Sequence, residues 1–163
     1  MLRHWWNFGM TTINELDIKN ALVYCLKRVF TDTKFYKDGT IKSYPCFYIS
    51  LTDIFINNIG LMDSELYEMN IFFKIEYHLS SDNSLISGFR TKMDEVGFKM
   101  IDCLRRISLY GKNYNISINN NEVIDGIRIF EGDFKIYSNY DKEEVEKMRK
   151  LFLEEVKWND STE

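Results

Sequence analysis

The strict alternation of side chains between residues 69 and 79 is the feature that most limits how this chain can fold. Large apolar residues take every second position, and mostly polar residues lie between them. Successive side chains of a β-strand point to opposite faces of the sheet, so the pattern predicts a long strand with one buried face. The apolar row consists of Met69, Ile71, Phe73, Ile75, Tyr77 and Leu79. Other parts of the chain must cover that row.

The segment Thr12-Ile13-Asn14-Glu15 has the T-x-x-E form of a capping box, in which the threonine hydroxyl and the glutamate carboxylate each satisfy a free backbone N–H group. It predicts a helix that begins near Thr12 and ends near Phe30. Apolar residues recur there every three or four positions, which places them on one side of the helix. This stripe consists of Ile18, Ala21, Leu22, Cys25, Leu26, Val29 and Phe30.

A second amphipathic helix is predicted to begin near Ser84 and to end before Gly111. Its apolar stripe consists of Phe89, Met93, Val96, Met100, Leu104 and Ile107. Gly88 and Gly97 each weaken such a helix by roughly 1 kcal/mol relative to alanine, unless close packing against the sheet compensates.

Shorter signals predict the remaining strands. We expect a short strand over residues 34–36, a turn at Asp38-Gly39, and a strand over residues 46–51 that follows the only proline, Pro45. Residues 115–140 predict two or three strands. Their turns are expected at residues 119–121, 125–126 and 131–132.

The order of these elements predicts an α+β fold, with a mostly antiparallel sheet and two helices packed on one face. An additional charged C-terminal helix is expected over residues 142–158. We divide the chain into an N-terminal arm (residues 1–11), the α+β domain (residues 12–141) and the C-terminal helix and tail (residues 142–163). The first nine residues are either an extension upstream of a natural start at Met10 or an arm with two exposed tryptophans.

The sequence contains no recognisable catalytic, nucleotide-binding or metal-binding motif. The net charge of −4 and the pI near 5.3 argue against the basic surface that nucleic-acid binding requires. The three cysteines have no C-x-x-C spacing and are interpreted as buried thiols, and His78 is interpreted as a surface histidine without a carboxylate at ligand spacing. We therefore expect no enzyme activity, no catalytic residues, no metal and no cofactor. We also expect no sequence-specific nucleic acid partner, and no membrane partner because the chain has no long apolar run.

Residues 53–67 show no clear period but are rich in large apolar residues, so they predict an irregular apolar loop. Such a loop either folds back over its own core or contacts another protein, because large exposed apolar patches are rare on monomers. We name its apolar residues as interface candidates, together with two tryptophans of the arm and two aromatic residues of the C-terminal helix. The candidates are Ile54, Phe55, Ile56, Ile59, Leu61, Met62, Trp5, Trp6, Phe152 and Trp158.

The order of signals resembles a known family. It runs from an amphipathic helix ending in Leu26-Lys27-Arg28-Val29-Phe30, through a short strand at Tyr36 and the strand Pro45-Cys46-Phe47-Tyr48-Ile49, to the alternating strand over residues 71–77. A second helix and closing strands follow. This pattern resembles the small tail terminator proteins of phages and prophages in low-GC bacteria, over about residues 13–140. The Trp-rich start and the helix over residues 142–158 depart from the family pattern.

The resemblance implies a protein that forms a ring, commonly a hexamer, on the last ring of the tail tube. There it stops tube polymerisation, and sheath polymerisation in contractile particles, and offers a surface for head attachment. The implied partners are other copies of the chain, the tail tube protein, the sheath protein and the head-tail connector or collar. The implied location is the bacterial cytoplasm during assembly, and then the head-proximal end of the tail of a virion or phage-tail-like particle. The alternatives are another ring component, such as a head-completion or tube protein, and a small cytoplasmic enzyme or regulator.

Overall fold

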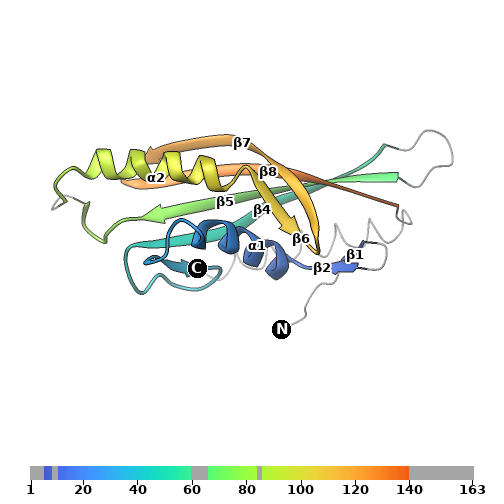
Figure 1. The fold of residues 1–163 in the computed structure, drawn as a ribbon, viewed down its shortest axis with the longest axis horizontal. Coiled ribbons are helices and arrows are strands. Elements are labelled where there is room, and N and C mark those ends of the chain that lie inside the picture. Colours follow the sequence, from blue (N-terminus) through green and yellow to red (C-terminus); the bar gives the residue numbers. More distant parts are fainter. Residues whose placement is uncertain (1–5, 9–10, 60–65, 84–85, 140–163) are drawn as a thin grey trace.

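The computed structural model of this chain describes residues 6–8, 11–59, 66–83 and 86–139. The described elements are two helices, one long-stranded sheet and one short hairpin (Figure 1). In chain order they are β1 (Trp6–Phe8), β2 (Thr11–Ile13), α1 (Glu15–Lys27), β3 (Lys34–Tyr36), β4 (Cys46–Asn58), β5 (Leu66–His78), α2 (Phe89–Cys103), β6 (Arg106–Leu109), β7 (Lys112–Ile124) and β8 (Ile127–Asn139). The predicted C-terminal helix lies outside the described residues.

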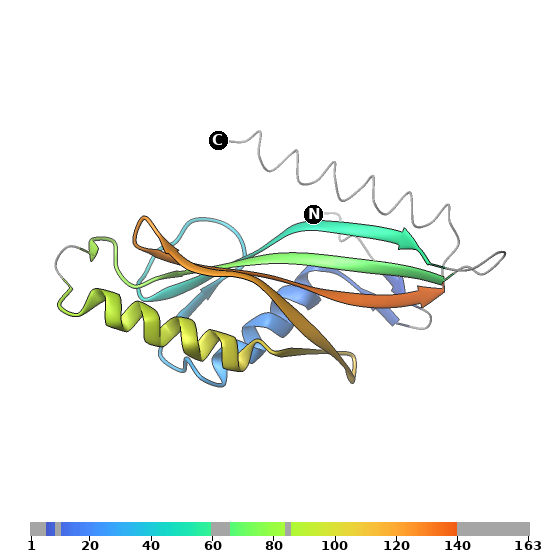
Figure 2. The ribbon, with the colours of Figure 1, turned by 90° about the horizontal axis from the view of Figure 1, so that it is seen from above.

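The main sheet has the strand order β3-β4-β5-β8-β7-β6. Its neighbours pair antiparallel, except that β3 runs parallel to β4. Both helices lie on the same side of the sheet (Figure 2). The sheet curls along β7, whose first part pairs with β6 and whose second part pairs with β8. The α+β class, the mostly antiparallel sheet and the two packed helices are therefore confirmed.

Strand β5 lies in the middle of the sheet and has the predicted register. Its apolar row from Met69 to Tyr77 is at most 5% exposed and faces the helices. The neighbouring strands add Phe47 and Phe130 to the same face, and the helices cover it with Leu22 and other residues. The core is therefore one layer of apolar side chains between the sheet and the two helices. Its helical members are Ile18, Leu22, Val23, Cys25, Leu26, Met93 and Met100.

The predicted irregular loop over residues 53–67 is wrong at both ends. Strand β4 continues to Asn58, and residues 66 and 67 already belong to β5. The reason is a β-bulge between Leu51 and Asp53, which inserts one extra residue into β4. Odd-numbered residues such as Ile49 face the core before the bulge, and even-numbered residues such as Ile54 face it afterwards. Because the core-facing positions change from odd to even at the bulge, the sequence of β4 as a whole shows no continuous period of two.

Helix α1 begins two to three residues later than predicted because a different capping box starts it. The Asp17 backbone N–H donates to Asn14 Oδ1 at 2.8 Å, and the Asn14 backbone N–H donates to Asp17 Oδ2 at 3.1 Å. Residues 11–13 form β2 instead, paired with residues 6–8. The helix ends at Lys27 and not near Phe30. Phe30 nevertheless returns to the core and packs edge-on against Phe47.

Helix α2 spans Phe89–Cys103, so its predicted start and end are both corrected. Gly88 precedes the helix with a φ of 67°, and Ile107 belongs to β6. Of the three turns predicted after residue 115, the structure has the one at Asp125-Gly126. The other two lie inside β7 and β8, where Asn119 is the extra residue of a β-bulge and Gly132 is paired on both sides. Tyr110 and Gly111, both with positive φ, form the turn between β6 and β7, which we did not predict.

Candidate protein interface

One end of the sheet extends beyond the part where β3 and β7 pair (Figure 1). Strand β3 pairs only with residues 46–48 of β4, and β7 pairs with β8 only as far as Phe134. In the described part of the chain, the outer edges of β4 from residue 49 and of β8 from residue 135 therefore have no strand partner. We call residues 53–58 of β4, 66–71 of β5 and 135–139 of β8 the strand extension. Unpaired edges of this kind offer backbone N–H and C=O groups to another chain.

The strand extension exposes apolar side chains on the face opposite the helices, which we call the open face. Phe55 is 46% exposed and packs edge-on against Phe72, with 5.5 Å between ring centroids. Tyr137 on β8 is 57% exposed, and Ile59 just beyond β4 is 42% exposed. These side chains give the unpaired edges an apolar surface beside them.

Several polar residues of the open face pair with one another. Lys135 Nζ lies 3.0 Å from Glu68 Oε1, and this hydrogen bond lowers the pKa of Glu68 and raises the pKa of Lys135. The carboxylate of Asp133, nearly buried on this face, accepts a hydrogen bond from Asn119 Nδ2 at 2.9 Å. These four side chains thus satisfy one another in pairs.

His78 is not the unpartnered surface histidine that we expected. Its side chain is mostly covered, and its Nε2 lies 3.2 Å from Glu76 Oε2, because the two residues are one strand period apart on the same face. Glu76 also pairs with Lys74 at 2.7 Å. Burial opposes ionisation of Glu76, but Lys74 and His78 together hold the pKa of its carboxyl below the usual range. Among the described residues, no group of three or more His, Cys, Asp or Glu side chains could hold a metal.

The structure places the predicted interface residues in different surroundings. Phe55 is exposed on the strand extension and Ile59 just beyond it, and Ile56 is partly buried against the core. Ile54 is 5% exposed and packs in the core, so it does not belong to the exposed set. The remaining candidates, Leu61, Met62, Trp5, Phe152 and Trp158, lie outside the described residues, while Trp6 lies in β1.

A second surface lies where both helices end. A hollow of about 380 Å³ is lined by residues of α1, of the end of α2 and of β6, and three of them are arginines. We call it the arginine hollow, and its lining residues are Cys25, Arg28, Val29, Asp102, Cys103, Arg105 and Arg106. The hollow could not be predicted from the sequence, because Arg28 is far from the other two arginines along the chain and no Lys/Arg block marks them.

The two thiols in the wall of the hollow have raised pKa values. Burial raises the pKa of Cys25, and burial together with the neighbouring Cys25 raises the pKa of Cys103 to about 12. Cys25 Sγ also donates to the Arg106 carbonyl at 3.5 Å. The thiols therefore stay protonated at neutral pH, which is unfavourable for nucleophilic chemistry.

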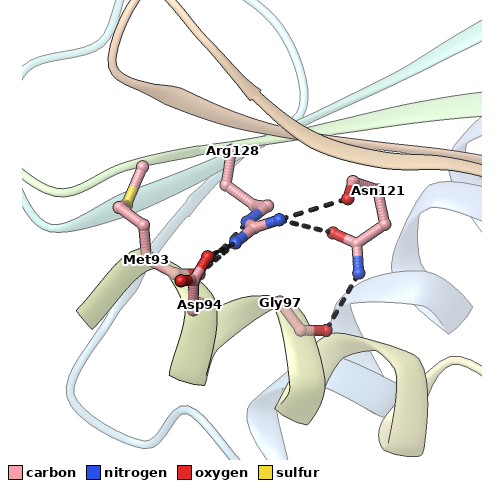
Figure 3. Close-up of polar contacts among 5 residues, drawn as sticks. All are labelled: Met93, Asp94, Gly97, Asn121 and Arg128. Carbon is pink, nitrogen blue, oxygen red and sulfur yellow. Dashed lines mark hydrogen bonds and ion pairs between the residues drawn. The ribbon is translucent and has the colours of Figure 1, made fainter. Parts of the chain in front are cut away.

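A cluster of polar groups around Arg128 holds α2 against the sheet (Figure 3). Arg128 is 6% exposed, and its Nε and Nη2 donate to the Met93 carbonyl at 3.1 and 2.8 Å. Its Nη2 also lies 2.8 Å from Asp94 Oδ1, and its Nη1 donates to the Asn121 carbonyl at 3.2 Å. Asn121 Nδ2 in turn donates to the Gly97 carbonyl at 3.1 Å. All of these groups pair with one another and hold α2 against the sheet. We call this cluster the Arg128 clamp.

Comparison with known proteins identifies the family. A family model described as phage tail terminator protein matches residues 17–147, from the third residue of α1 to beyond the end of β8. No curated protein matches the chain. In the described residues, no helix has the length and apolar character needed to span a membrane. The resemblance noted in the sequence is confirmed: the chain belongs to the phage tail terminator family and is a protein of viral tail assembly.

Proposed function

We propose that this chain is a structural, non-catalytic tail terminator. Copies of it assemble into a ring, a hexamer in the commonest form, on the last ring of the tail tube. The ring stops tube polymerisation, and that of the sheath where the tail contracts, and presents a surface to the head-tail connector or collar. Assembly takes place in the bacterial cytoplasm, and the finished ring lies at the head-proximal end of the tail.

The observation that carries this proposal, beyond the family match, is the pair of unpaired edges of the strand extension. The edges belong to different strands, β4 and β8, on opposite sides of the same three-stranded unit. A ring of identical subunits uses two unlike surfaces on each copy, and closure of the ring leaves neither surface free. The exposed Phe55, Ile59 and Tyr137 add apolar area beside these edges.

The electrostatics of the chain are compatible with a ring through which DNA passes. The net charge of −4 repels phosphate groups, so the lumen of such a ring would not retain the nucleic acid. The partly buried polar groups described above are paired with one another, which favours a mechanical role over a chemical one.

The test is co-expression with the tail tube protein of the same particle. We expect tubes of limited length that carry a ring at one end, seen by negative-stain electron microscopy, and longer, uncapped tubes without the chain. Tubes of the same length distribution with and without the chain, and no ring at either end, would contradict the proposal. A tube protein would instead form tubes by itself, and a head-completion protein would bind the portal in place of the tube.

A further inference from the structure

We infer that successive copies in the ring, beside their contact at the strand extension, also contact each other through the tip of the β7–β8 hairpin, which one copy places in the arginine hollow of the next. The inference rests on the proposed ring and names a surface and a partner for it. It is carried by five features: the free charges of the hollow, its exposed aromatic flanks, the acidic and apolar tip, the bracing of that tip, and the separation of the two sites on the molecule.

The arginine hollow has positive charge that the described part of the chain leaves unpaired. Arg105 Nη2 lies 2.8 Å from Asp102 Oδ1, but Arg28 and Arg106 have no carboxylate partner among the described residues. A basic residue at a helix C-terminus, such as Arg28, also complements the helix dipole. That effect does not account for Arg106, which is the first residue of a strand.

Two strongly exposed aromatic side chains flank the hollow. Tyr24 is 68% exposed and precedes Arg28 by one helical turn, and Phe98 is 70% exposed and precedes Asp102 by one turn. Residues four apart are neighbours on a helix surface, so both rings lie beside the lining of the hollow. Arginine, tyrosine and other aromatic residues are enriched in protein interfaces, and arginine and tyrosine at their energetic centres. The composition therefore fits a protein partner that carries carboxylates next to apolar side chains.

The tip of the β7–β8 hairpin has that composition. Glu122 and Asp125 flank Val123 and Ile124, which are 39% and 43% exposed. No lysine or arginine occurs between Lys112 and Arg128 in the sequence, so the tip itself is an acidic and apolar segment. The nearby positive charge comes from Arg90 of α2, which lies beside Val123. A second copy of this chain can thus supply the occupant that the hollow requires.

The tip is braced, which reduces the entropy lost when it docks. Its two-residue turn, Asp125-Gly126, has φ values of 50° and 80°, as in a tight hairpin turn that follows the twist of the sheet. Asn83 Nδ2 donates to the Gly126 carbonyl at 3.1 Å. The Arg128 clamp then fixes both strands behind the tip to α2 (Figure 3). A preformed contact segment binds more tightly than one that must first be ordered.

The tip and the hollow lie at opposite ends of α2. Val123 lies beside Phe89 and Arg90 at the beginning of the helix, whereas the hollow includes Asp102 and Cys103 at its end. One copy can therefore insert its tip into a neighbour and receive another tip at the same time. Such a head-to-tail contact between unlike surfaces generates rings when the rotation between subunits closes.

The test uses charge reversal with rescue. The hairpin variant is Glu122→Lys with Asp125→Asn, where asparagine tolerates the positive φ at 125. The hollow variant is Arg28→Gln with Arg106→Glu, and the third variant combines all four substitutions. A control, Asp38→Lys with Thr40→Lys, changes the net charge as the hairpin variant does, at exposed residues that belong neither to the hollow nor to the hairpin tip. Thermal melting checks that each variant is folded.

Association between subunits is measured by light scattering after size exclusion, and by ring density on tubes made with the tail tube protein. We expect the hairpin and hollow variants each to weaken association by at least about tenfold at low salt. The combined variant should recover most of that loss, and the control should behave like the wild-type chain. Added salt should weaken the wild-type association as well.

The outcomes separate this inference from the proposed function. If the wild-type chain caps tubes and both charge variants cap them equally well, the tip does not dock in the hollow, although the terminator function stands. If both variants fail and their combination fails as well, the two sites are not partners. If the wild-type chain itself neither caps tubes nor forms rings with the tube protein, the proposed function is wrong and the inference falls with it.

Discussion

The guanidinium of Arg128 lies where a side chain at position 97 would begin. A β-carbon on Gly97 would be 2.8 Å from Arg128 Cζ and about as close to two of its nitrogens. The missing side chain lets the guanidinium rest on the backbone of α2 and reach the Met93 carbonyl. Gly97 looks like a weakness of the helix in the sequence, but close packing against the sheet explains why glycine stands there.

We predict that Gly97→Ala lowers the free energy of unfolding by about 1–3 kcal/mol. Alanine favours a helix by roughly 1 kcal/mol over glycine, but the added methyl group displaces the guanidinium, and hydrogen bonds from a charged donor contribute about 1.5–3 kcal/mol each. Urea unfolding measures the difference. Phe98→Ala, at the exposed neighbouring position, should stay within about 0.5 kcal/mol of wild type. An unchanged or higher stability of Gly97→Ala would mean that the guanidinium moves aside without loss.

The second prediction concerns Arg128→Met, which removes the clamp and keeps most of the apolar stem. We expect a loss of about 1–3 kcal/mol, since Asp94 is about half exposed and is not left as a buried charge. In the Arg128→Met background, Gly97→Ala should become neutral or stabilising, because nothing is left for the methyl group to displace. A double-mutant cycle by urea unfolding measures this coupling. Additive effects of the two substitutions would show that the steric conflict is not the cause.

The sequence predicts the parts of this fold in which a single period holds throughout. The row around Phe73 on β5 is free of bulges, so its alternation gives the register directly. The continuation of β4 could not be predicted, because the extra residue at Thr52 moves the apolar positions to the other parity. The sequence predicts a turn at Gly132, but the residue lies inside β8, where its small size admits the Phe73 ring, with only 2.9 Å from the β-carbon position to Phe73 Cζ.

The candidate interface could be predicted only in part. The apolar content of residues 53–59 correctly indicates Phe55 and Ile59 as exposed apolar residues, although most of the predicted loop is a strand. A large apolar side chain can be exposed in a strand as well as in a loop. The arginine hollow could not be predicted, because the ends of α1 and α2 bring Arg28 and Arg106 together only in the folded chain.

The third prediction tests the core face of β5. Phe73→Ala should lower the free energy of unfolding by about 3–5 kcal/mol, because the ring is 1% exposed and packs beside Phe130 and Phe134. Phe72→Ala is the matched control, with the same change one position away on the open face, and should cost clearly less. Equal losses in chemical denaturation would contradict the register.

The fourth prediction concerns the thiols. In the folded protein at pH 8, Cys25, Cys46 and Cys103 should react slowly with a disulfide reagent, because burial covers Cys25 and Cys46 and raises the pKa of Cys103 to about 12. All three should react at once in denaturant. The rise in absorbance of the released thiol counts them in both conditions. Rapid reaction of Cys25 or Cys103 in the native state would show that the contact between the helix ends opens readily.

The last prediction tests the strand extension as a contact surface. Phe55→Ser with Ile59→Ser should leave the monomer folded, because both side chains are already more than 40% exposed and their loss opens no cavity in the core. The same pair should weaken ring formation or give tails of uncontrolled length, since apolar and aromatic anchors supply much of the energy of an interface. Tube length in electron micrographs and the melting temperature measure the two effects.

The control for that prediction is Ile54→Ser, one residue from Phe55 but on the opposite face of β4. Ile54 is 5% exposed in the core, so this substitution should lower the melting temperature by several degrees in the monomer itself. Assembly would then fail only as far as folding fails. If the Phe55 and Ile59 substitutions also lower the melting temperature by several degrees, their side chains support the subunit's own structure. If they change neither stability nor tail length, the strand extension is not the contact surface, and the arginine hollow and the β7–β8 tip remain as the candidate interface.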